Sequence, residues 1–128
     1  MSQQPRSEKP EVDFPDGPPP ADLQVVDVIE GDGPEAGPGQ TALVHYVGVA
    51  YSTGEEFDAS WNRGEAFSFP LGGGRVIAGW DQGVVGMKVG GRRRLVIPPH
   101  LGYGDRGAGG AIAPGETLIF IVDLLSLR

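Results

Sequence analysis

A group of aromatic side chains, with a few polar groups beside them, is the part of this sequence best suited to bind a ligand. Its members are Tyr46, Phe57, Phe67, Phe69, Trp80, Tyr103 and Phe120, and Asp58 directly follows Phe57. A hollow lined by aromatic rings binds a small, mostly uncharged ligand, which the polar groups at its rim orient. The hydroxyls of Tyr46 and Tyr103 need hydrogen-bond partners where they are buried. For Phe69 we expect a plain core position.

Other catalytic chemistries find little support in the sequence. His45 and His100 lie far apart and lack ligand-spaced partners, and the chain has no cysteine, so we expect no metal site. We interpret His45 as a solvent-facing strand residue. No serine stands in a nucleophile-elbow context, and the acidic residues fall mostly in turns, which gives a glycosidase-type carboxylate pair no support.

Two glycine-rich stretches resemble the sequence motifs of phosphate-binding loops but lack the flanking features that such loops require. GYGDRG (102–107) matches G-x-G-x-x-G, but the following AGGAIAPGE does not predict the helix that a dinucleotide site requires. GGG at 72–74 lacks the Lys and Ser/Thr of a P-loop. RRR at 92–94 falls in a predicted strand, where we interpret it as a solvated strand face. We therefore expect loop glycines, no cofactor and no nucleic-acid partner.

The composition predicts one globular domain. The 128 residues are 39% hydrophobic and 21% charged, and 22 glycines and 12 prolines require many turns. A net charge of −7 argues against binding to a phosphate backbone. MSQQPRSEKPEVDF at the N-terminus lacks the apolar region of a signal peptide, and no later stretch is apolar for long enough to span a bilayer. We expect a cytoplasmic protein with no membrane partner.

Residues 1–22 differ from the rest, and we predict a disordered, proline-rich tail before a domain at residues 23–128. Half of the chain's 12 prolines fall here among Gln, Ser, Glu and Asp. Such a segment buries too little apolar surface to offset its ordering entropy. Three roles stay open: a solubilising arm, an inhibitor that places Phe14-Pro15 in a binding cleft, or a cover in which Phe14 lies over Ile119 and Ile121.

The domain alternates apolar and polar residues with a period of two, which predicts strands. They are expected at 23–31, 41–51, 65–72, 92–98 and 116–127, with a turn at 52–60 leading to Phe57. Residues 77–85 break the rhythm, because Ile77, Trp80 and Val84 fall on one face of a helix. We expect this short helix to fill the concave face of a twisted antiparallel sheet.

These elements contain a series of recognisable blocks. They are HYVG (45–48), EFDAS (56–60), FSFPLG (67–72), VIAGWDQGV (76–84), MKVGGRRRLVIPP (87–99), GYG (102–104) and TLIFIVDLL (117–125). Their order and spacing resemble the FKBP-type peptidyl-prolyl cis-trans isomerases, immunophilins that bind the macrolides tacrolimus and rapamycin. The resemblance covers residues 23–128. It implies an α+β, mainly β fold, in which a five- to six-stranded twisted antiparallel sheet wraps around one short helix.

The resemblance also implies a site. Its ligand-binding residues would be Tyr46, Phe57, Asp58, Phe67, Val76, Ile77, Trp80, Tyr103, Ile112 and Phe120, of which Tyr46, Asp58, Tyr103 and Phe120 would be catalytic. In this family pattern Trp80 forms the floor beneath a proline ring, Ile112 belongs to an apolar flap and Phe120 forms the far wall. The chain departs from the pattern in the loop 105–115, DRGAGGAIAPG, whose small alanines predict a looser flap.

The activity implied is prolyl isomerisation in proline-containing polypeptides during protein folding, by a monomer. No bond breaks when an X–Pro amide rotates, so this reaction requires no nucleophile, metal or cofactor. An alternative is a non-catalytic proline-recognition or chaperone module that uses the same cleft. The presence of Asp58 and Tyr103 at the rim favours catalysis.

Overall fold

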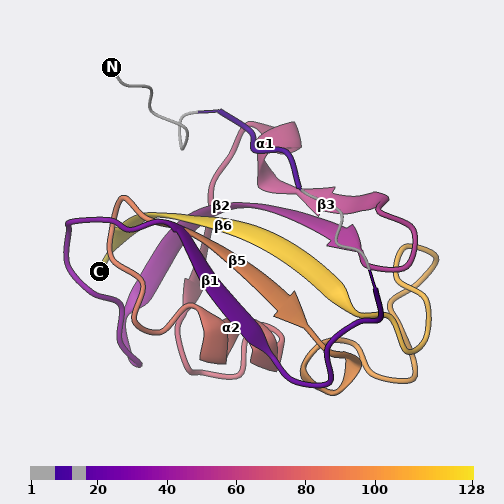
Figure 1. Ribbon diagram of the computed structural model, residues 1–128. Helices are drawn as coiled ribbons and strands as arrows, with labels where there is room; N and C mark the ends of the chain where they lie inside the picture. The colour runs from indigo at the N-terminus through magenta and orange to yellow at the C-terminus, as the bar shows by residue number, and fades with distance from the viewer. Residues whose placement is uncertain (1–7, 13–16) are drawn as a thin grey trace.

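The computed structural model describes residues 8–12 and 17–128, and its strands form one six-stranded antiparallel sheet. The strands are β1 (Gln24–Ile29), β2 (Thr41–Ala50), β3 (Glu56–Ala59), β4 (Phe67–Pro70), β5 (Arg92–Ile97) and β6 (Leu118–Leu127). Their spatial order is β1-β5-β6-β2-β3, and β4 also pairs with β2 (Figure 1). The long strands β2 and β6 lie side by side at the centre. The predicted fold class is confirmed.

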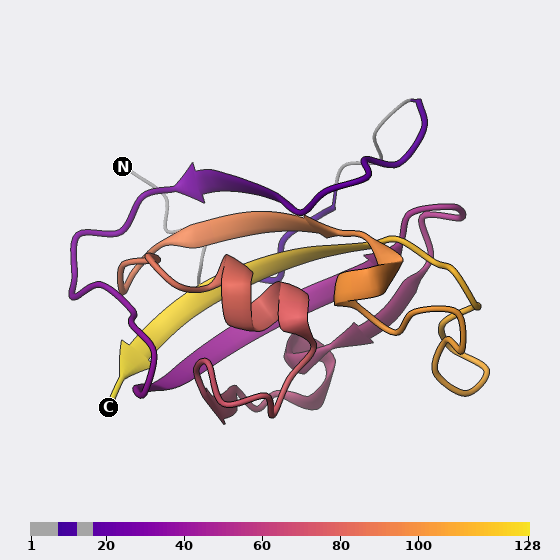
Figure 2. The same cartoon turned by 90° about the horizontal axis from the view of Figure 1, so that it is seen from below.

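The helix predicted over 77–85 is α2 (Ala78–Gly83), which lies across the concave face of the sheet (Figure 2). Two glycines allow this close approach. A Cβ at Gly79 would lie 2.5 Å from Ile97 Cγ2, and one at Gly83 would lie 2.7 Å from Leu95 Cδ2. The helix therefore presses Trp80 against the sheet, where its side chain is 4% exposed. Two shorter helices are α1 (Ser60–Arg63) and the 3₁₀ helix η2 (Pro99–Leu101).

Side chains on the two faces of the sheet form two hydrophobic clusters. On β2, Val44 and Tyr46 belong to the main cluster with α2, whereas Val47 and Val49 belong to a second cluster on the opposite face. Each fully buried Val or Leu contributes about 1.5–3 kcal/mol relative to an exposed one. Phe69 is 2% exposed in the main cluster, which confirms its predicted core position.

Two predictions about local structure were wrong. Residues 56–59 form β3 rather than a turn, because the segment pairs with β2, where Asp58 lies opposite Gly48. Arg92 and Arg93 do not form a solvated face, since they are 6% and 9% exposed. Arg92 Nε donates to Asp123 Oδ1 at 2.7 Å, and Arg93 Nε donates to Asp27 Oδ1 at 2.7 Å, so each guanidinium is neutralised by a neighbouring strand.

His45 is half-buried rather than turned freely to solvent. Its ring stacks on Trp61 with 4.2 Å between ring centroids, and its Nδ1 lies 2.8 Å from Ser60 Oγ. The Tyr46 N–H donates to the same Ser60 Oγ at 2.7 Å. The fully buried Ser60 side chain thus joins the start of α1 to β2.

Residues 8–12 lie against the face of the sheet opposite α2, beside α1 and β3 (Figure 1). Val12 packs on the second cluster, which contains Ile119. The Lys9 ammonium lies 2.8 Å from a Glu56 carboxylate oxygen and donates to Asn62 Oδ1 at 2.8 Å. Phe14 lies outside the described residues, as do the tail roles predicted for it. In the described ranges, no helix has the length and hydropathy needed to cross a bilayer.

Candidate active site

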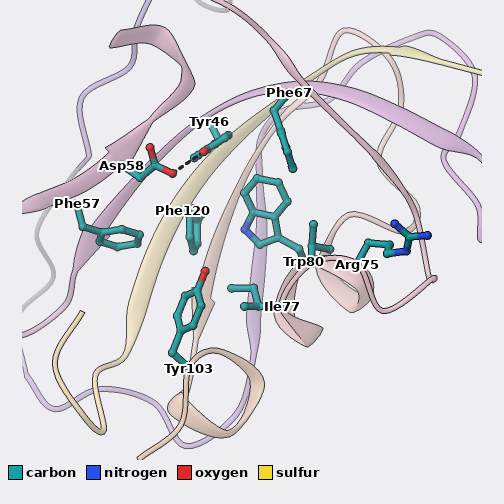
Figure 3. A pocket seen from close by; sticks show the side chains of 10 residues that line it. Tyr46, Phe57, Asp58, Phe67, Arg75, Ile77, Trp80, Tyr103 and Phe120 are labelled. Carbon is teal, nitrogen blue, oxygen red and sulfur yellow. Dashed lines mark hydrogen bonds between the residues drawn. The ribbon is translucent and has the colours of Figure 1, made fainter. Parts of the chain in front are cut away.

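A cavity of about 210 Å³ opens on the concave face, between α2, β2, β3, β6 and the loop after η2 (Figure 3). Its lining residues are Tyr46, Phe57, Asp58, Phe67, Arg75, Val76, Ile77, Trp80, Tyr103 and Phe120. Every residue predicted to bind ligand, apart from Ile112, is therefore found in one place. The residues come from segments far apart in the sequence, and the sheet brings them together.

Aromatic rings make the floor and walls of the cavity. The Trp80 ring meets those of Tyr46 and Phe120 edge to face, with centroids 5.0 and 5.3 Å apart. Phe57 packs on Phe120 in the same way at 5.5 Å. Such contacts contribute about 0.5–1.5 kcal/mol per pair beyond the buried area. The indole N–H of Trp80 is buried without an acceptor among the described residues, so the floor offers an apolar surface.

Gly48, which the sequence analysis overlooked, makes room for this packing. It lies on β2 between Asp58 of β3 and Phe120 of β6. A Cβ at this position would lie 2.6 Å from Phe120 Cε1 and 2.7 Å from Phe57 Cζ. The available signal was a glycine inside a strand, which often marks a place where other groups approach the backbone closely.

The polar rim is a hydrogen-bonded group of Asp58, Tyr46 and Arg63. Tyr46 Oη donates to Asp58 Oδ2 at 2.5 Å, and Arg63 donates to Asp58 Oδ1 at 2.7 Å and to Tyr46 Oη at 2.9 Å. Arg63 was not predicted, and only its position five residues after Asp58 hinted at it. The group holds the Asp58 carboxylate in one orientation at the edge of the cavity.

The charges of this group follow from its surroundings. Burial by itself would raise the pKa of Asp58, but hydrogen bonds from Tyr46 and Arg63 outweigh burial and lower that pKa below its ordinary value. Burial and the hydrogen bond to Asp58 raise the pKa of Tyr46. Near neutral pH, Asp58 is therefore an anion and Tyr46 a neutral donor. The Asp58 and Arg63 side chains are 41% and 48% exposed, so solvent screens their attraction.

Two further donors at the cavity have no partner in the described part of the chain. The Tyr103 hydroxyl makes no hydrogen bond there, and burial, followed by the charge of Asp58, raises its pKa. The backbone N–H of Ile77, just before α2, also makes none, although the Ile77 carbonyl accepts from the backbone N–H of Trp80 at 2.9 Å. Both groups are available to a ligand carbonyl.

Comparison with known proteins identifies the family. Residues 33–125 match the model of the FKBP-type peptidyl-prolyl cis-trans isomerases. The chain belongs to this family. The "FK506-binding protein" of Streptomyces anulatus is 73% identical to this FKBP over 121 residues, covering 94% of this chain and 98% of its own. The "Probable FK506-binding protein" of Corynebacterium glutamicum is 56% identical over 119 residues, covering 93% and 98%.

The fold of this FKBP is also that of solved structures. The crystal structure of AtFKBP13 superposes with a TM-score of 0.77 at 42% identity, covering 83% of this chain and 93% of the other. The agreement extends to the mainly β architecture with a short helix, as predicted from the sequence.

The lining of the cavity differs from the prediction at two residues. Ile112 was predicted to line it and does not, and Arg75 lines it but was not predicted. Ile112 is 5% exposed and belongs to the main core, and it lines a neighbouring hollow of about 490 Å³ rather than the cavity. A bridge between Ala108 and Ile112 folds the loop back on itself and holds the side chain there. Arg75 lines the cavity instead, and nothing in the sequence distinguished this exposed arginine from others.

The arrangement binds and orients an uncharged group without reacting with it. Its walls are apolar rings and its one carboxylate is already paired. Its donors without a partner among the described residues are a hydroxyl, a backbone N–H and, at the mouth, the Arg75 guanidinium. Among the described residues, no three His, Cys, Asp or Glu side chains gather in a way that could hold a metal ion. The chemistry that fits is rotation about a bond inside an oriented substrate.

Proposed function

We propose that this cavity isomerises X–Pro bonds by binding the twisted amide more tightly than either planar form. Amide resonance sets a rotation barrier of about 18–20 kcal/mol. Only interactions that are stronger in the transition state than in the ground state accelerate the reaction. A thousandfold acceleration requires about 4 kcal/mol of such differential binding. A few hydrogen bonds and one well-packed ring are enough for that.

The proline ring lies on Trp80 in this proposal, between Tyr46 and Phe120. The observation that carries the proposal is the indole floor, 4% exposed and enclosed by aromatic rings 5.0–6.0 Å away. A twisted amide has lost resonance and carries a less polar carbonyl, so it loses less on leaving water than a planar amide does. An apolar cavity therefore favours the twisted form.

The polar groups orient the substrate chain around that ring. The free Ile77 N–H donates to a substrate carbonyl, and the Tyr103 hydroxyl, which lies beside Ile77 in Figure 3, donates to a second acceptor. Asp58 is held by Tyr46 and Arg63, so its carboxylate keeps one orientation at the rim and helps to position the substrate chain. These contacts act by position, and none transfers a proton.

The same cavity is proposed to bind FK506 (tacrolimus) and rapamycin-type macrolides. Support comes from the names of the relatives from Streptomyces anulatus and Corynebacterium glutamicum, which are FK506-binding proteins, and from the cavity lining described above. A macrolide that occupies the cavity excludes the peptide, so a macrolide that binds must also inhibit peptide isomerisation.

A protease-coupled assay on an Ala-Leu-Pro-Phe peptide tests the proposal. We expect cis-to-trans conversion to accelerate in proportion to protein concentration, and FK506 to abolish the acceleration. Binding of the peptide without any acceleration would instead support a non-catalytic proline-recognition module. Acceleration that FK506 leaves unchanged would place the activity outside this cavity.

The isomerase domain is proposed to comprise residues 23–128, preceded by the proline-rich tail at 1–22, of which residues 8–12 pack on the sheet. Support comes from β1, which begins at Gln24, and from the family match, which begins at residue 33. A chain of residues 23–128 should keep the kcat/KM of the full chain, and a change in kcat/KM on truncation would argue against this division. Action as a cytoplasmic monomer on unfolded, proline-containing chains stays a prediction, which cell fractionation and light scattering test.

A further inference from the structure

Arg75 is a cationic group at the mouth of the cavity. It lines the cavity and is exposed, and it makes no ion pair or hydrogen bond within the described ranges. Figure 3 shows it beside Ile77 and Trp80, on the opposite side of the cavity from Asp58, with its guanidinium extending outward from the rim. It is therefore placed for the part of the substrate chain that leaves the cavity, rather than for the proline ring.

The loop that carries Arg75 is fixed from α2. The two carboxylate oxygens of Asp81 accept hydrogen bonds from the backbone N–H groups of Gly72 and Gly74, at 2.9 and 3.0 Å. These contacts hold the turn that ends at Arg75 against the helix bearing Trp80. Because both oxygens of Asp81 already accept backbone hydrogen bonds, this carboxylate is engaged and Arg75 stays available.

Arg63, the other arginine at this site, differs from Arg75 in having partners. Arg63 is bound to Asp58 and Tyr46, so its charge is matched within the rim. Within residues 8–12 and 17–128, Arg75 has no such match, although the chain as a whole carries a net charge of −7. A substrate that brings a negative charge to this part of the rim supplies the missing partner, and one that brings a positive charge is repelled.

We propose that Arg75 selects substrates with an acidic side chain, Asp or Glu, close to the proline on the flank that leaves the cavity past Ile77 and Trp80. This inference rests on the proposed function of the same cavity and adds a substrate class to it. An exposed pair in water is weak, so the discrimination between acidic and basic peptides is about two- to fivefold. It decreases as salt is raised.

The test uses peptides of one length with Glu or Lys at a single position, before or after the Leu-Pro pair. The readout is the ratio of kcat/KM for the Glu peptide to that for its Lys counterpart. We expect a ratio above one on one flank in the wild-type protein, kept in Arg75→Lys and inverted in Arg75→Glu. Arg128→Glu, the same charge change at the C-terminus outside the cavity lining, is the matched control and should keep the ratio.

A ratio that Arg75→Glu leaves unchanged overturns the inference. So does a change of equal size in Arg128→Glu, because the overall charge of the protein would then explain it. Dissociation constants for the same peptides, from titration of the Trp80 indole signal, separate this inference from the proposed function. Charge-dependent binding without isomerisation would retain the selection by Arg75 and refute catalysis. Peptides that neither bind nor isomerise would refute both.

Discussion

The two tryptophans of this chain lie on opposite faces of the same sheet and differ in what surrounds them. Trp80 is carried by α2 on the concave face and forms the floor of the cavity. Trp61 is carried by α1 and packs on the second cluster, stacked on His45 at 4.2 Å. Both indole N–H groups are buried without an acceptor among the described residues. The difference is that the rings around Trp80 leave space for a ligand.

Each face of the sheet also carries an Asp–Arg ion pair, and the two pairs differ in how exposed they are to solvent. Asp58 and Arg63, at the rim of the cavity, are about half exposed and bind Tyr46 as well. Asp123 and Arg92, on the other face, are 0% and 8% exposed. A buried ion pair matters to folding because removing one partner leaves an uncompensated charge. The comparison links the buried pair on the convex face to folding and the exposed pair at the rim of the concave face to function.

The largest effect on stability is expected when one partner of the buried ion pair is removed. Asp123→Asn should lower the free energy of unfolding by about 3–5 kcal/mol, since Arg92 loses its counter-ion in the interior. Denaturant titration measures the loss, and kcat/KM per folded molecule should not change. Asp58→Asn is the matched variant at the exposed pair and should change stability by less than about 1 kcal/mol. Equal stability losses in the two variants would contradict the assignment.

The second prediction compares two neighbouring residues of β6 that face opposite ways. Phe120→Leu should lower kcat/KM by about tenfold, because it removes the far wall and its aromatic contacts with Trp80 and Phe57. Ile119→Leu alters the second cluster and should keep the wild-type kcat/KM. The peptide assay measures both, with circular dichroism to confirm folding. A similar decrease in kcat/KM in the two variants would mean that any substitution in this part of β6 lowers activity, whichever face the side chain is on.

The third prediction concerns pH and the exposed pair. The pKa of Asp58 is lowered in the folded protein, so its contribution is present at neutral pH and is lost as pH falls through that lowered pKa. We expect kcat/KM to be constant down to the ordinary aspartate value of 3.8 and to decrease only below it. Asp58→Asn should be about fivefold less active and show no such decrease. A decrease that begins well above pH 3.8, or that persists in Asp58→Asn, would contradict this.

The smallest effect is expected where the N-terminal segment contacts the convex side. Lys9→Ala removes an exposed ion pair with Glu56 and a hydrogen bond to Asn62. It should lower the free energy of unfolding by about 0.5 kcal/mol and leave kcat/KM unchanged. Thermal unfolding and the peptide assay check the two values. A clear decrease in kcat/KM would mean that the segment positions β3, and with it Phe57 and Asp58, from behind.

Much of this division could be predicted from the sequence. Period-two strands, the short helix and the aromatic lining are local patterns or contiguous family blocks, so they were predictable. The burial of Arg92 and Arg93 was not, because their partners Asp123 and Asp27 lie on other strands. Register decides which carboxylate meets which guanidinium, and a single sequence does not state the register.

The cavity residues could also be predicted only in part from the sequence. Trp80 and Tyr46 were predicted because they match the family blocks, while Arg75 and Arg63 look like any exposed arginine. Ile112 was assigned to the cavity by the family pattern, but the turn between residues 108 and 112 directs it into the core. Loop side chains depend on hydrogen bonds within the loop, which composition does not reveal.

The most direct test of the account records both indole N–H signals by NMR while an X–Pro peptide, and then FK506, is added. In the same spectra, exchange between the cis and trans peptide signals reports isomerisation. The account predicts that the Trp80 signal shifts with peptide, that the Trp61 signal stays in place, and that FK506 stops the exchange. A Trp80 signal that does not respond, or equal shifts of both tryptophans, would contradict the claim that the indole on the concave face is the floor of the active site.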